Sequence, residues 1–583
     1  MDEGLHQHAE EAIRQMRRVG SDYRTVEAKA AEGGLPRNAR NAVAAFANTH
    51  GGLLLLGLRE PDFKPLAVDA ARLAGDLAAT CAEDLEPPIR PEIEIITIEG
   101  QQVVAALVDE LLPTQKPCFV KSKGLQAGSY IRTHDGNRRL SHYEIHVLIS
   151  GRGQPQDDMA RVPGAIPEHL DPDLVASLLG RLRNRRGPGF ASLDDDQILR
   201  SVGVLVGGEE PGISLAGLLA LGRYPQQFVP QLNVTFVAYP TTNGEPLEDG
   251  TRFLDNESLD GSIPVMLSGS LAAIRRNLTR RAIVTGEGRR DRWEYPEEAL
   301  RELVVNALMH RDYHPLAHGS QIRIELYPDR LEITSPGGLH GPIDRQSLFA
   351  EAVTSSRNSR LAKLLEDVEL PRSGRTVCEN RASGLVAIAH YFRNAGLEPP
   401  VVKDDVKSFQ VVLRNDGLLN AEAAVWLSML DLTRVSDNQR LGLAFMGRNG
   451  VISNSQYRVL TGCEPKEATQ DLVDLMRLGI IERSHDRLWP TWRLSSGSGY
   501  RKRQPGRTVG NSSDGGAGKS LGRRAQIRFL LASGPKSAGV LAEELGMTRG
   551  GLLRWLRRME EDGEVRPTEA RRQSPRNRWK LDL

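Results

Sequence analysis

Runs of apolar residues at helix and strand spacing divide this chain into several folded segments, and one of them concentrates most of the candidate chemistry. From Glu298 to Met309 apolar residues recur every three or four positions, which predicts an amphipathic helix. Gln321–Leu326 and Arg330–Thr334 then alternate apolar and polar residues around a Pro-Asp turn, which predicts two paired strands. Ser335-Pro336-Gly337-Gly338 ends the second strand, and its glycines allow the backbone to approach a flat ligand closely.

The predicted helix carries two polar residues suited to phosphate chemistry. Glu302 and Asn306 are four positions apart, so they lie one turn from each other on the same side. A carboxylate can act as general base toward a water, and a neutral amide oxygen can ligate Mg²⁺ without cancelling its charge. The same spacing also fits a solvated polar face on an ordinary helix.

The segments RELVVNALMHRDY and DRLEITSPGGL, in this order, resemble the divergent GHKL-type ATPase domain of bacterial ATP-binding regulator-like proteins. The resemblance implies an α/β sandwich that binds ATP with Mg²⁺, with Glu302 activating water and Asn306 as the metal ligand. Gly337 and Gly338 would line the adenine side, and Gly384 would open a helix whose amino end faces the phosphates. Active members carry an aspartate before the first glycines, where this chain has Ser335-Pro336.

The segment Arg357-Asn358 resembles part of the same family's pattern, although Ser359 stands where the family has proline. It would contact phosphate or order a lid. A helix cap before the apolar run Leu361–Leu365 explains it equally well.

The amino-terminal part predicts a helix over residues 5–19, a strand over Tyr23–Lys29, a helix over Arg37–Asn48 and a fully apolar strand over Leu53–Leu58. The order of Glu27-Ala-Lys29, AFANTHGGLLLLG and SYIRTHDGNRRLSHYEI resembles the Schlafen AlbA-like domain. That resemblance implies a mixed αβ fold associated with nucleic acid and, in some relatives, an acid-dependent RNA-cleaving site.

Glu27, with Lys29 beside it, is the single position carried over to that catalytic site. A structural cross-strand pair explains these two residues equally well. Three further carboxylates are candidates by their proximity to the motifs: Glu32, Asp109 and Glu144.

Basic side chains surround a predicted hairpin turn in the last of these motifs. Arg132, Arg138 and Arg139 flank Asp135-Gly136-Asn137, so we expect a basic tip that touches phosphates. An ordinary solvated hairpin is the alternative.

The charge is concentrated at the carboxyl end. From Ser496 onward there are 19 Lys and Arg against 9 Asp and Glu, a net charge of +10 in a chain whose total is +1. A helix-turn-helix is predicted there, and its third helix offers four arginines to DNA: Arg549, Arg554, Arg557 and Arg558. An earlier predicted winged helix has an acidic recognition-position helix, Lys466–Leu478, which favours a protein contact, such as dimerisation, over DNA.

Length and composition complete the prediction. The 583 residues, 26% charged and 39% apolar, indicate several globular domains, and no stretch suits a membrane helix or a signal peptide, so we expect a cytoplasmic location. The four cysteines have no paired spacing that would indicate a zinc site or disulfides.

We therefore predict an α+β multidomain chain: a Schlafen AlbA-like domain (1–150), a linker and helical scaffold (151–290), a GHKL-type ATPase domain (291–415), a winged helix (416–495), a flexible basic linker (496–523) and a helix-turn-helix or winged-helix domain (524–583).

Three functions fit this organisation. The first is an ATP-binding, DNA-associated transcriptional regulator or defence-type protein whose nucleotide site modulates nucleic-acid binding, with weak ATPase activity at most. The second is a Schlafen-like nuclease, acting on DNA or RNA, gated by the ATPase-like domain. The third keeps the GHKL-like domain as a nucleotide-free scaffold.

Overall fold

The chain forms two compact units, residues 1–502 and 503–583. A computed structural model describes the residues in the following ranges: 3–133, 136–185, 188–208, 210–278, 280–285, 288–341, 348–349, 355–371, 373–378, 384–415, 417–418, 423, 427, 432, 435–484, 486, 490–495, 537–538, 541, 552–553, 556, 559–560, 565–568 and 578–581. Among these residues no helix is long and apolar enough to cross a membrane.

A four-stranded sheet forms the amino-terminal part of the first unit, in the order β1 (Val26–Lys29), β2 (Gly52–Leu56), β7 (Gln101–Val108), β6 (Glu92–Ile98). Strand β1 runs parallel to β2, and the other neighbours are antiparallel. The leucines of β2 alternate between two cores, because helix α1 (Glu3–Val19) packs on one face and helices α2 (Ala39–Asn48) and α3 (Ala70–Glu83) pack on the other. A strand buried on both faces explains the uninterrupted apolar run.

A hairpin and a helix follow this sheet. Strands β9 (Tyr130–Arg132) and β10 (Asn137–Arg139) pair antiparallel, and helix α5 (His142–Ser150) begins three residues later. Ser141 and Glu144 form a capping box at the start of α5, so two of its backbone amides are satisfied locally.

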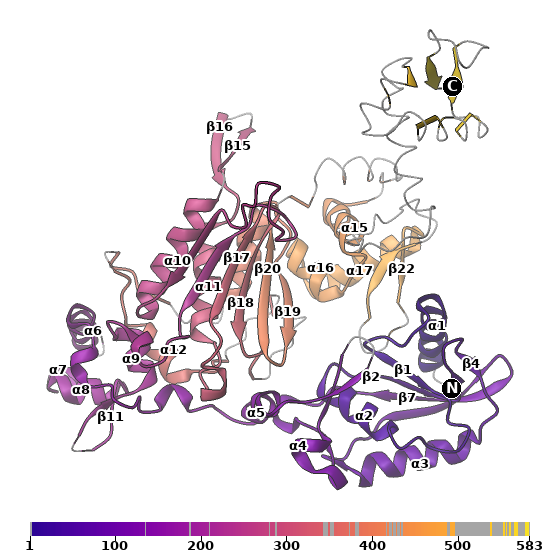
Figure 1. The fold of residues 1–583 in the computed structure, drawn as a ribbon, viewed down its shortest axis with the longest axis horizontal. Coiled ribbons are helices and arrows are strands. Elements are labelled where there is room, and N and C mark those ends of the chain that lie inside the picture. The colour runs from indigo at the N-terminus through magenta and orange to yellow at the C-terminus, as the bar shows by residue number, and fades with distance from the viewer. Residues whose placement is uncertain are drawn as a thin grey trace. The chain divides into compact units, whose positions relative to one another are not determined.

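The largest sheet has six strands, in the order β14 (Asp255–Leu259), β13 (Val234–Ala238), β17 (Ile322–Tyr327), β18 (Arg330–Pro336), β20 (Ser408–Arg414), β19 (Val401–Asp405). Strand β13 is parallel to β17, and the other neighbours are antiparallel. Helices α10 (Ile263–Asn277) and α11 (Glu297–Met309) lie across one face (Figure 1) and share its apolar core.

This sheet corrects one expectation from the sequence. We expected residues 151–290 to form a linker and helical scaffold, yet β13 and β14 belong to the same sheet as β17. The reason is that every residue of β13 pairs with β17, and no local sequence pattern reveals this pairing.

Between α10 and α11 the chain forms a separate antiparallel ribbon of β15 (Arg280–Thr285) and β16 (Gly288–Trp293). Helix α10 ends at Asn277. The side chain of Asn277 donates to the carbonyl of Ala273 (3.0 Å) and to Asp255 (2.6 Å). An asparagine side chain that bonds in this way competes with continued helix.

Within 437–494, the described residues form three helices and a small sheet. The helices are α15 (Asp437–Asn449), α16 (Asn454–Thr461) and α17 (Pro465–Arg477), and the strands are β21 (Val451–Ile452), β22 (Ile481–Arg483) and β23 (Trp492–Leu494), with β23 central. Their apolar residues form a core of their own. In the second unit, β24 (Val565–Pro567) pairs with β25 (Trp579–Leu581).

The described chain contains these further elements: strands β3 (Leu58–Arg59), β4 (Lys64–Pro65), β5 (Leu85–Glu86), β8 (Phe119–Val120), β11 (Leu205–Val206) and β12 (Gly212–Ile213); helices α4 (Gly124–Gly128), α6 (Pro172–Arg185), α7 (Pro188–Ala191), α8 (Asp195–Ser201), α9 (Leu215–Leu221), α12 (Ser359–Leu365) and α13 (Gly384–Asn394); and the 3₁₀ helices η1 (Pro113–Gln115), η2 (Lys121–Lys123), η3 (Asp157–Met159), η4 (Pro167–His169), η5 (Pro225–Gln227) and η6 (Pro315–Ala317).

Candidate functional sites

The polar face of α11 brings Glu302 and Asn306 together. The Asn306 Nδ2 atom donates to Glu302 Oε1 at 3.3 Å, and both residues are partly exposed. The opposite side of α11 is buried in the core of the six-stranded sheet, which fixes the orientation of the helix. A carboxylate and an amide are therefore held side by side on a rigid element.

The first residue of α13 lies directly against this pair. A Cβ atom built on Gly384 would overlap Glu302 Oε1, so an added side chain at this position would displace the Glu302 carboxylate. The amino end of a helix carries partial positive charge, which stabilises a neighbouring anion. The structure thus brings together Glu302, Asn306 and Gly384, which lie far apart along the chain.

Ser335 precedes the glycine turn at the end of β18, and its hydroxyl bonds within the protein. Its Oγ donates to the carbonyl of Ala307 in α11 at 3.0 Å, and the residue is buried. This hydrogen bond ties strand β18 to α11. No carboxylate is present at this position to accept a bond from a ligand amino group.

The glycine turn after β18 is packed against other parts of the chain. Gly337 has φ +88°, and a Cβ atom on it would overlap the guanidinium of Arg357 and lie 2.7 Å from Asp312 Cβ. A Cβ atom on Gly338 would lie 2.6 Å from the carbonyl oxygen of Asp405. These close approaches explain the need for glycine here, and contact of the turn with adenine stays a prediction.

The His310–Tyr313 segment and the Arg357-Asn358 segment hold each other at the end of α11. Asn358 donates from Nδ2 to the carbonyls of Met309 and Arg311, both at 2.8 Å, and the Arg357 Nη1 atom lies 3.6 Å from Asp312 Oδ2. Burial lowers the pKa of His310 to about 4, so this imidazole is neutral near pH 7.

Asn358 does stand at the residue before α12, but its side chain makes no cap bond there. Asp158 caps α12 instead, since its Oδ2 accepts from the backbone amides of Arg360 (2.9 Å) and Leu361 (3.0 Å). The side chain of Asn358 is therefore not the helix cap, because Asp158 accepts from the first amides of α12 instead.

Helix α5 contacts the same cluster. The Tyr143 hydroxyl donates to Asp312 Oδ2 at 2.9 Å, and the His146 ring stacks on His314 with centroids 3.4 Å apart. Gln154 donates to the carbonyl of Arg357 at 2.6 Å. The segment that follows the amino-terminal hairpin is thus bonded to the end of α11.

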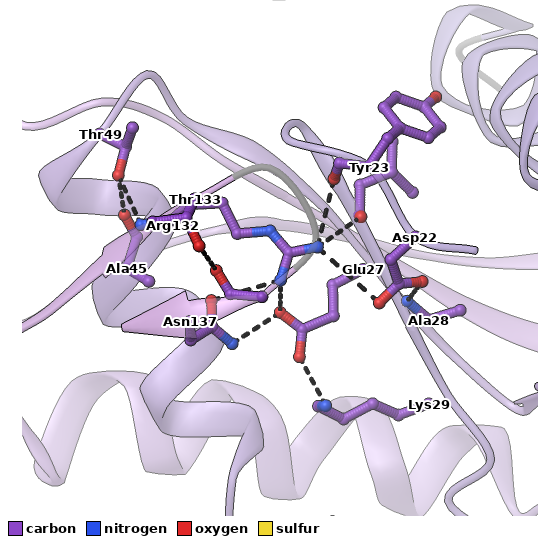
Figure 2. Close-up of polar contacts among 12 residues, drawn as sticks. Asp22, Tyr23, Glu27, Ala28, Lys29, Ala45, Thr49, Arg132, Thr133 and Asn137 are labelled. Carbon is purple, nitrogen blue, oxygen red and sulfur yellow. Dashed lines mark hydrogen bonds and ion pairs between the residues drawn. The ribbon is translucent and has the colours of Figure 1, made fainter. Parts of the chain in front are cut away.

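The second candidate site surrounds Glu27 (Figure 2). Glu27 is 4% exposed, and three side chains bond its carboxylate: Lys29 Nζ at 2.5 Å from Oε1, and Arg132 Nη1 at 2.7 Å and Asn137 Nδ2 at 2.8 Å from Oε2. The predicted Glu27–Lys29 pair is present as an ion pair. Both carboxylate oxygens are already occupied by cations and an amide of the protein.

Arg132 corrects the prediction of an exposed basic tip. It is 2% exposed, and its Nη2 atom donates to the carbonyls of Val26 (2.9 Å) and Tyr23 (3.2 Å). Its guanidinium bonds the Glu27 carboxylate and these two carbonyls, so this arginine points into the protein (Figure 2). Arg138 is exposed and bonds Glu144 at 2.5 Å.

Asp22 belongs to the Glu27 network and was missed in the sequence. Its Oδ1 accepts from the Ala28 amide at 3.1 Å, and its Oδ2 lies 3.8 Å from Arg132 Nη2. Burial raises the pKa of Asp22 to about 6, and the nearby Glu27 carboxylate adds to the rise. Its signal in the sequence is a second acid five residues before Glu27.

The remaining carboxylates do not complete a metal site in the described part of the chain. Glu144 bonds Arg138 and the backbone amide of Ser141 (2.7 Å), and these bonds lower its pKa to about 2 against the effect of burial. No group of three or more acidic, histidine or cysteine residues that would hold a metal ion occurs among the described residues. The four arginines predicted to meet DNA, Arg549, Arg554, Arg557 and Arg558, lie outside those residues.

Two segments of the chain match known protein families. Residues 22–141 match the family described as "Schlafen, AlbA_2", and residues 319–413 match the family described as "Putative ATP-dependent DNA helicase recG C-terminal". The second match includes Gly337, Gly338 and Gly384 and begins after α11, so Glu302 and Asn306 precede it. No curated protein matches the chain.

The solved structures that are similar to the chain include the following two. The crystal structure of the DIP2311 protein from Corynebacterium diphtheriae is 18% identical, with 85% of this chain and 98% of that chain covered and a TM-score of 0.36. The solution structure titled "N-terminal Domain of Putative ATP-dependent DNA Helicase RecG-related Protein from Nitrosomonas europaea" is 28% identical, with 23% of this chain and 94% of that chain covered and a TM-score of 0.19.

Proposed function

We propose that this chain is a nucleotide-responsive, DNA-associated regulator that binds ATP with Mg²⁺ on the polar face of α11. The observation that carries the proposal is the contact of Glu302 with both Asn306 and the first residue of α13. The match of residues 319–413 to the family described as "Putative ATP-dependent DNA helicase recG C-terminal" supports it.

The residues present fit the phosphate end of such a ligand. The Asn306 amide oxygen is a neutral ligand for Mg²⁺, and Glu302 is placed to hold a water as general base. The amino end of α13 adds a favourable field for phosphate. When bound, Mg²⁺ would offset the charge of the phosphates, while the protein orients them against α11 and α13.

The adenine end fits less well. Ser335 replaces the aspartate of the family and donates its hydroxyl proton to Ala307 at 3.0 Å. Recognition of the base must therefore come from other groups. This departure is what keeps the nucleotide-free scaffold as an alternative.

Helix α13 offers a route from this site to the carboxyl-terminal part of the first unit. Its first residue lies on Glu302, and Arg393 near its end donates to the carbonyl of Val459 in α16 at 3.0 Å. Glu398, which follows α13 and is 1% exposed, lies 3.4 Å from Arg448 of α15. A shift of α13 at its nucleotide end would therefore change the contacts that this region makes with α15 and α16.

We assign a winged helix to residues 437–494, on the order helix, strand, helix, helix, strand, strand. Helix α17 stands at its recognition position and carries Glu467, Asp471 and Asp474. These acids favour a protein contact, including one between two copies of the chain, over a DNA backbone. DNA binding is assigned instead to the basic segment from Ser496 onward, with its net charge of +10.

The second candidate function is a nuclease centred on Glu27. The presence of Asp22 in the same network favours it, because a nuclease needs converging carboxylates. The bonds from Lys29 and Arg132 to Glu27 count against it, since they neutralise the carboxylate and occupy its oxygens.

Calorimetric titration of Mg-ATP into the full chain tests the nucleotide site. We expect micromolar binding that is lost in Asn306→Ala and retained in the control Asn394→Ala, which removes an asparagine at the far end of α13. Absence of heat in the unaltered protein would refute the nucleotide site.

DNA binding separates the regulator from the nuclease. We expect Arg554→Gln combined with Arg557→Gln to abolish DNA binding, and Glu27→Gln to leave it unchanged. A nuclease predicts that Glu27→Gln abolishes cleavage of DNA or RNA while the arginine changes leave cleavage intact.

A further inference from the structure

Strand β6 lies at one edge of the four-stranded sheet. It pairs with β7 on one side, and no strand of the described chain pairs with its other side. The opposite edge strand, β1, is bonded by a side chain of the protein, because Arg132 donates to the carbonyl of Val26 at 2.9 Å. The outer side of β6 is therefore a place where a further strand can be added to the sheet.

The sequence of β6 differs from that of a protected edge strand. Natural edge strands are commonly kept from pairing by short length, by lysines or by prolines. β6 is seven residues long and contains no lysine, arginine or proline. At its centre the side chain of Ile95 is 44% exposed. A long edge strand with an exposed apolar centre is suited to pairing.

The two cores of the sheet fix which face each residue of β6 occupies. Ile96 and Ile98 are buried in the core beneath α1, whereas Ile93 packs partly against the core beneath α2 and α3. Because side chains alternate along a strand, Glu92 and Glu94 share the face of Ile96 and Ile98. An added strand must match this alternation to keep its own apolar residues on the correct face.

Two copies of the chain that pair through β6 would be related by a two-fold axis perpendicular to the sheet. This axis makes the two strands antiparallel and keeps each face of the sheet on its own side, so every residue opposes one from the same face. An axis through Ile95 pairs all seven residues and places Ile95 opposite its own copy. The two acids then stand opposite isoleucines, Glu92 with Ile98 and Glu94 with Ile96.

The neighbouring registers fit less well. An axis through Glu94 brings two carboxylates opposite each other, and an axis through Ile93 places Glu92 opposite Glu94, both of which are destabilising. An axis through Ile96 leaves Glu92 and Ile93 outside the pairing. The charges of β6 are therefore complementary to those of a second β6 in one full-length register, which favours a second copy of the chain as the partner.

We propose that two copies of this chain pair antiparallel through β6 and join their four-stranded sheets into one continuous sheet. An interface built on one strand pair is small, so the dimer should form reversibly, with a dissociation constant in the micromolar range. This surface is separate from the proposed nucleotide site. It is also separate from α17, the other candidate for a contact between copies.

Sedimentation velocity of the full chain over a range of concentrations tests the proposal. The unaltered protein should show a reversible equilibrium between monomer and dimer. Ile95→Lys should raise the dissociation constant at least about tenfold, because two like charges would face each other at the two-fold axis. The matched control is Val19→Lys, which places the same charge on a 60% exposed apolar residue at the end of α1. It should change the dissociation constant by less than about twofold.

A charge-reversal pair tests the register and checks folding at the same time. Ile95→Lys and Ile95→Glu should each be monomeric alone at concentrations where the unaltered chain is dimeric. Mixing the two variants should restore a dimer, because a lysine of one copy then faces a glutamate of the other. Restored pairing requires both variants to be folded, so it separates a lost contact from a lost structure.

A dimer that persists unchanged in Ile95→Lys would place the contact elsewhere, such as at α17, and would overturn the assignment to β6. An unaltered chain that stays monomeric at every concentration would overturn it as well, as would a mixture of the two variants, each with the melting temperature of the unaltered chain, that does not dimerise. Mg-ATP binding should be unchanged in every β6 variant, so failure of the nucleotide site and failure of this interface are distinguishable.

Discussion

The buried ion pair between Glu27 and Arg132 predicts a large loss of stability when Arg132 is shortened or neutralised. The two residues are 4% and 2% exposed, and Nη1 lies 2.7 Å from Oε2. Arg132→Met keeps the stem of the side chain but removes this bond and the two to the carbonyls of Val26 (2.9 Å) and Tyr23 (3.2 Å). Removing one partner of a buried pair costs about 3–5 kcal/mol. The bonds from Lys29 and Asn137 keep Glu27 partly satisfied, which favours the lower end of this range.

Hydrogen exchange followed by mass spectrometry measures this loss in the full chain, because it reports each segment separately in a multidomain protein. Peptides covering β1 and the β9–β10 hairpin should exchange at least about a hundredfold faster in Arg132→Met, which corresponds to roughly 3 kcal/mol. Arg139→Met removes an exposed arginine from the neighbouring strand and serves as the control. Its effect should stay within about 0.5 kcal/mol.

The same assay tests whether the contacts of Glu27 stabilise the fold or hold the carboxylate in place for catalysis. We expect Glu27→Gln to destabilise β1 by about 1.5–3 kcal/mol, since hydrogen bonds to a charged group are lost. The double variant should lose less stability than the sum of the two single ones, because the pair is coupled. Unchanged exchange in Arg132→Met, or slower exchange in Glu27→Gln, would refute the reasoning.

Two further predictions concern other contacts of the two sites. Gly384→Ala should weaken Mg-ATP binding at least about tenfold, roughly 1.4 kcal/mol, because the new methyl overlaps Glu302 Oε1. The control is Gly180→Ala in α6, where a Cβ atom meets nothing within 4 Å, and it should leave calorimetric titrations unchanged. Burial raises the pKa of Asp22 from 3.8 to about 6, so its ionisation disfavours the folded state as pH rises through this range. Above pH 6, the backbone amides of β1 should therefore exchange more slowly in Asp22→Asn than in the unaltered chain. This difference should vanish toward pH 4, and a difference independent of pH would contradict the prediction.

The elements that the sequence predicts best are those whose packing is local. Helix α11 appears within one residue of its predicted start, because its apolar spacing matches one buried face of a helix. Strands β17 and β18 follow from the alternation around Pro328-Asp329. The contact between Glu302 and Asn306 follows from the helical repeat alone.

The parts that escaped prediction depend on contacts between distant segments. The Glu27–Arg132 pair joins residues 105 positions apart. The motif around Arg132 therefore indicated a basic hairpin, but it did not reveal that Arg132 is buried. The sequence assigned Gly384 and Glu302 to one site only through the resemblance to a family, because no spacing along the chain relates the two residues. The residues after α10 are basic like its last turn, so the sequence does not show where the helix ends and β15 begins. The end at Asn277 becomes clear only from the bonds of its side chain.

For the proposed nucleotide site, the hydrogen bond from Ser335 to Ala307 has a consequence for ligand selectivity. A site that holds a nucleotide by its phosphates, on Asn306 and the amino end of α13, without a carboxylate for the adenine amino group, distinguishes triphosphates from monophosphates better than it distinguishes purines from pyrimidines. Such a protein would respond to the total pool of nucleoside triphosphates, and GTP or CTP would replace ATP in the same titration. The signal it conveys would then be the phosphorylation state of the cell's nucleotides as a whole.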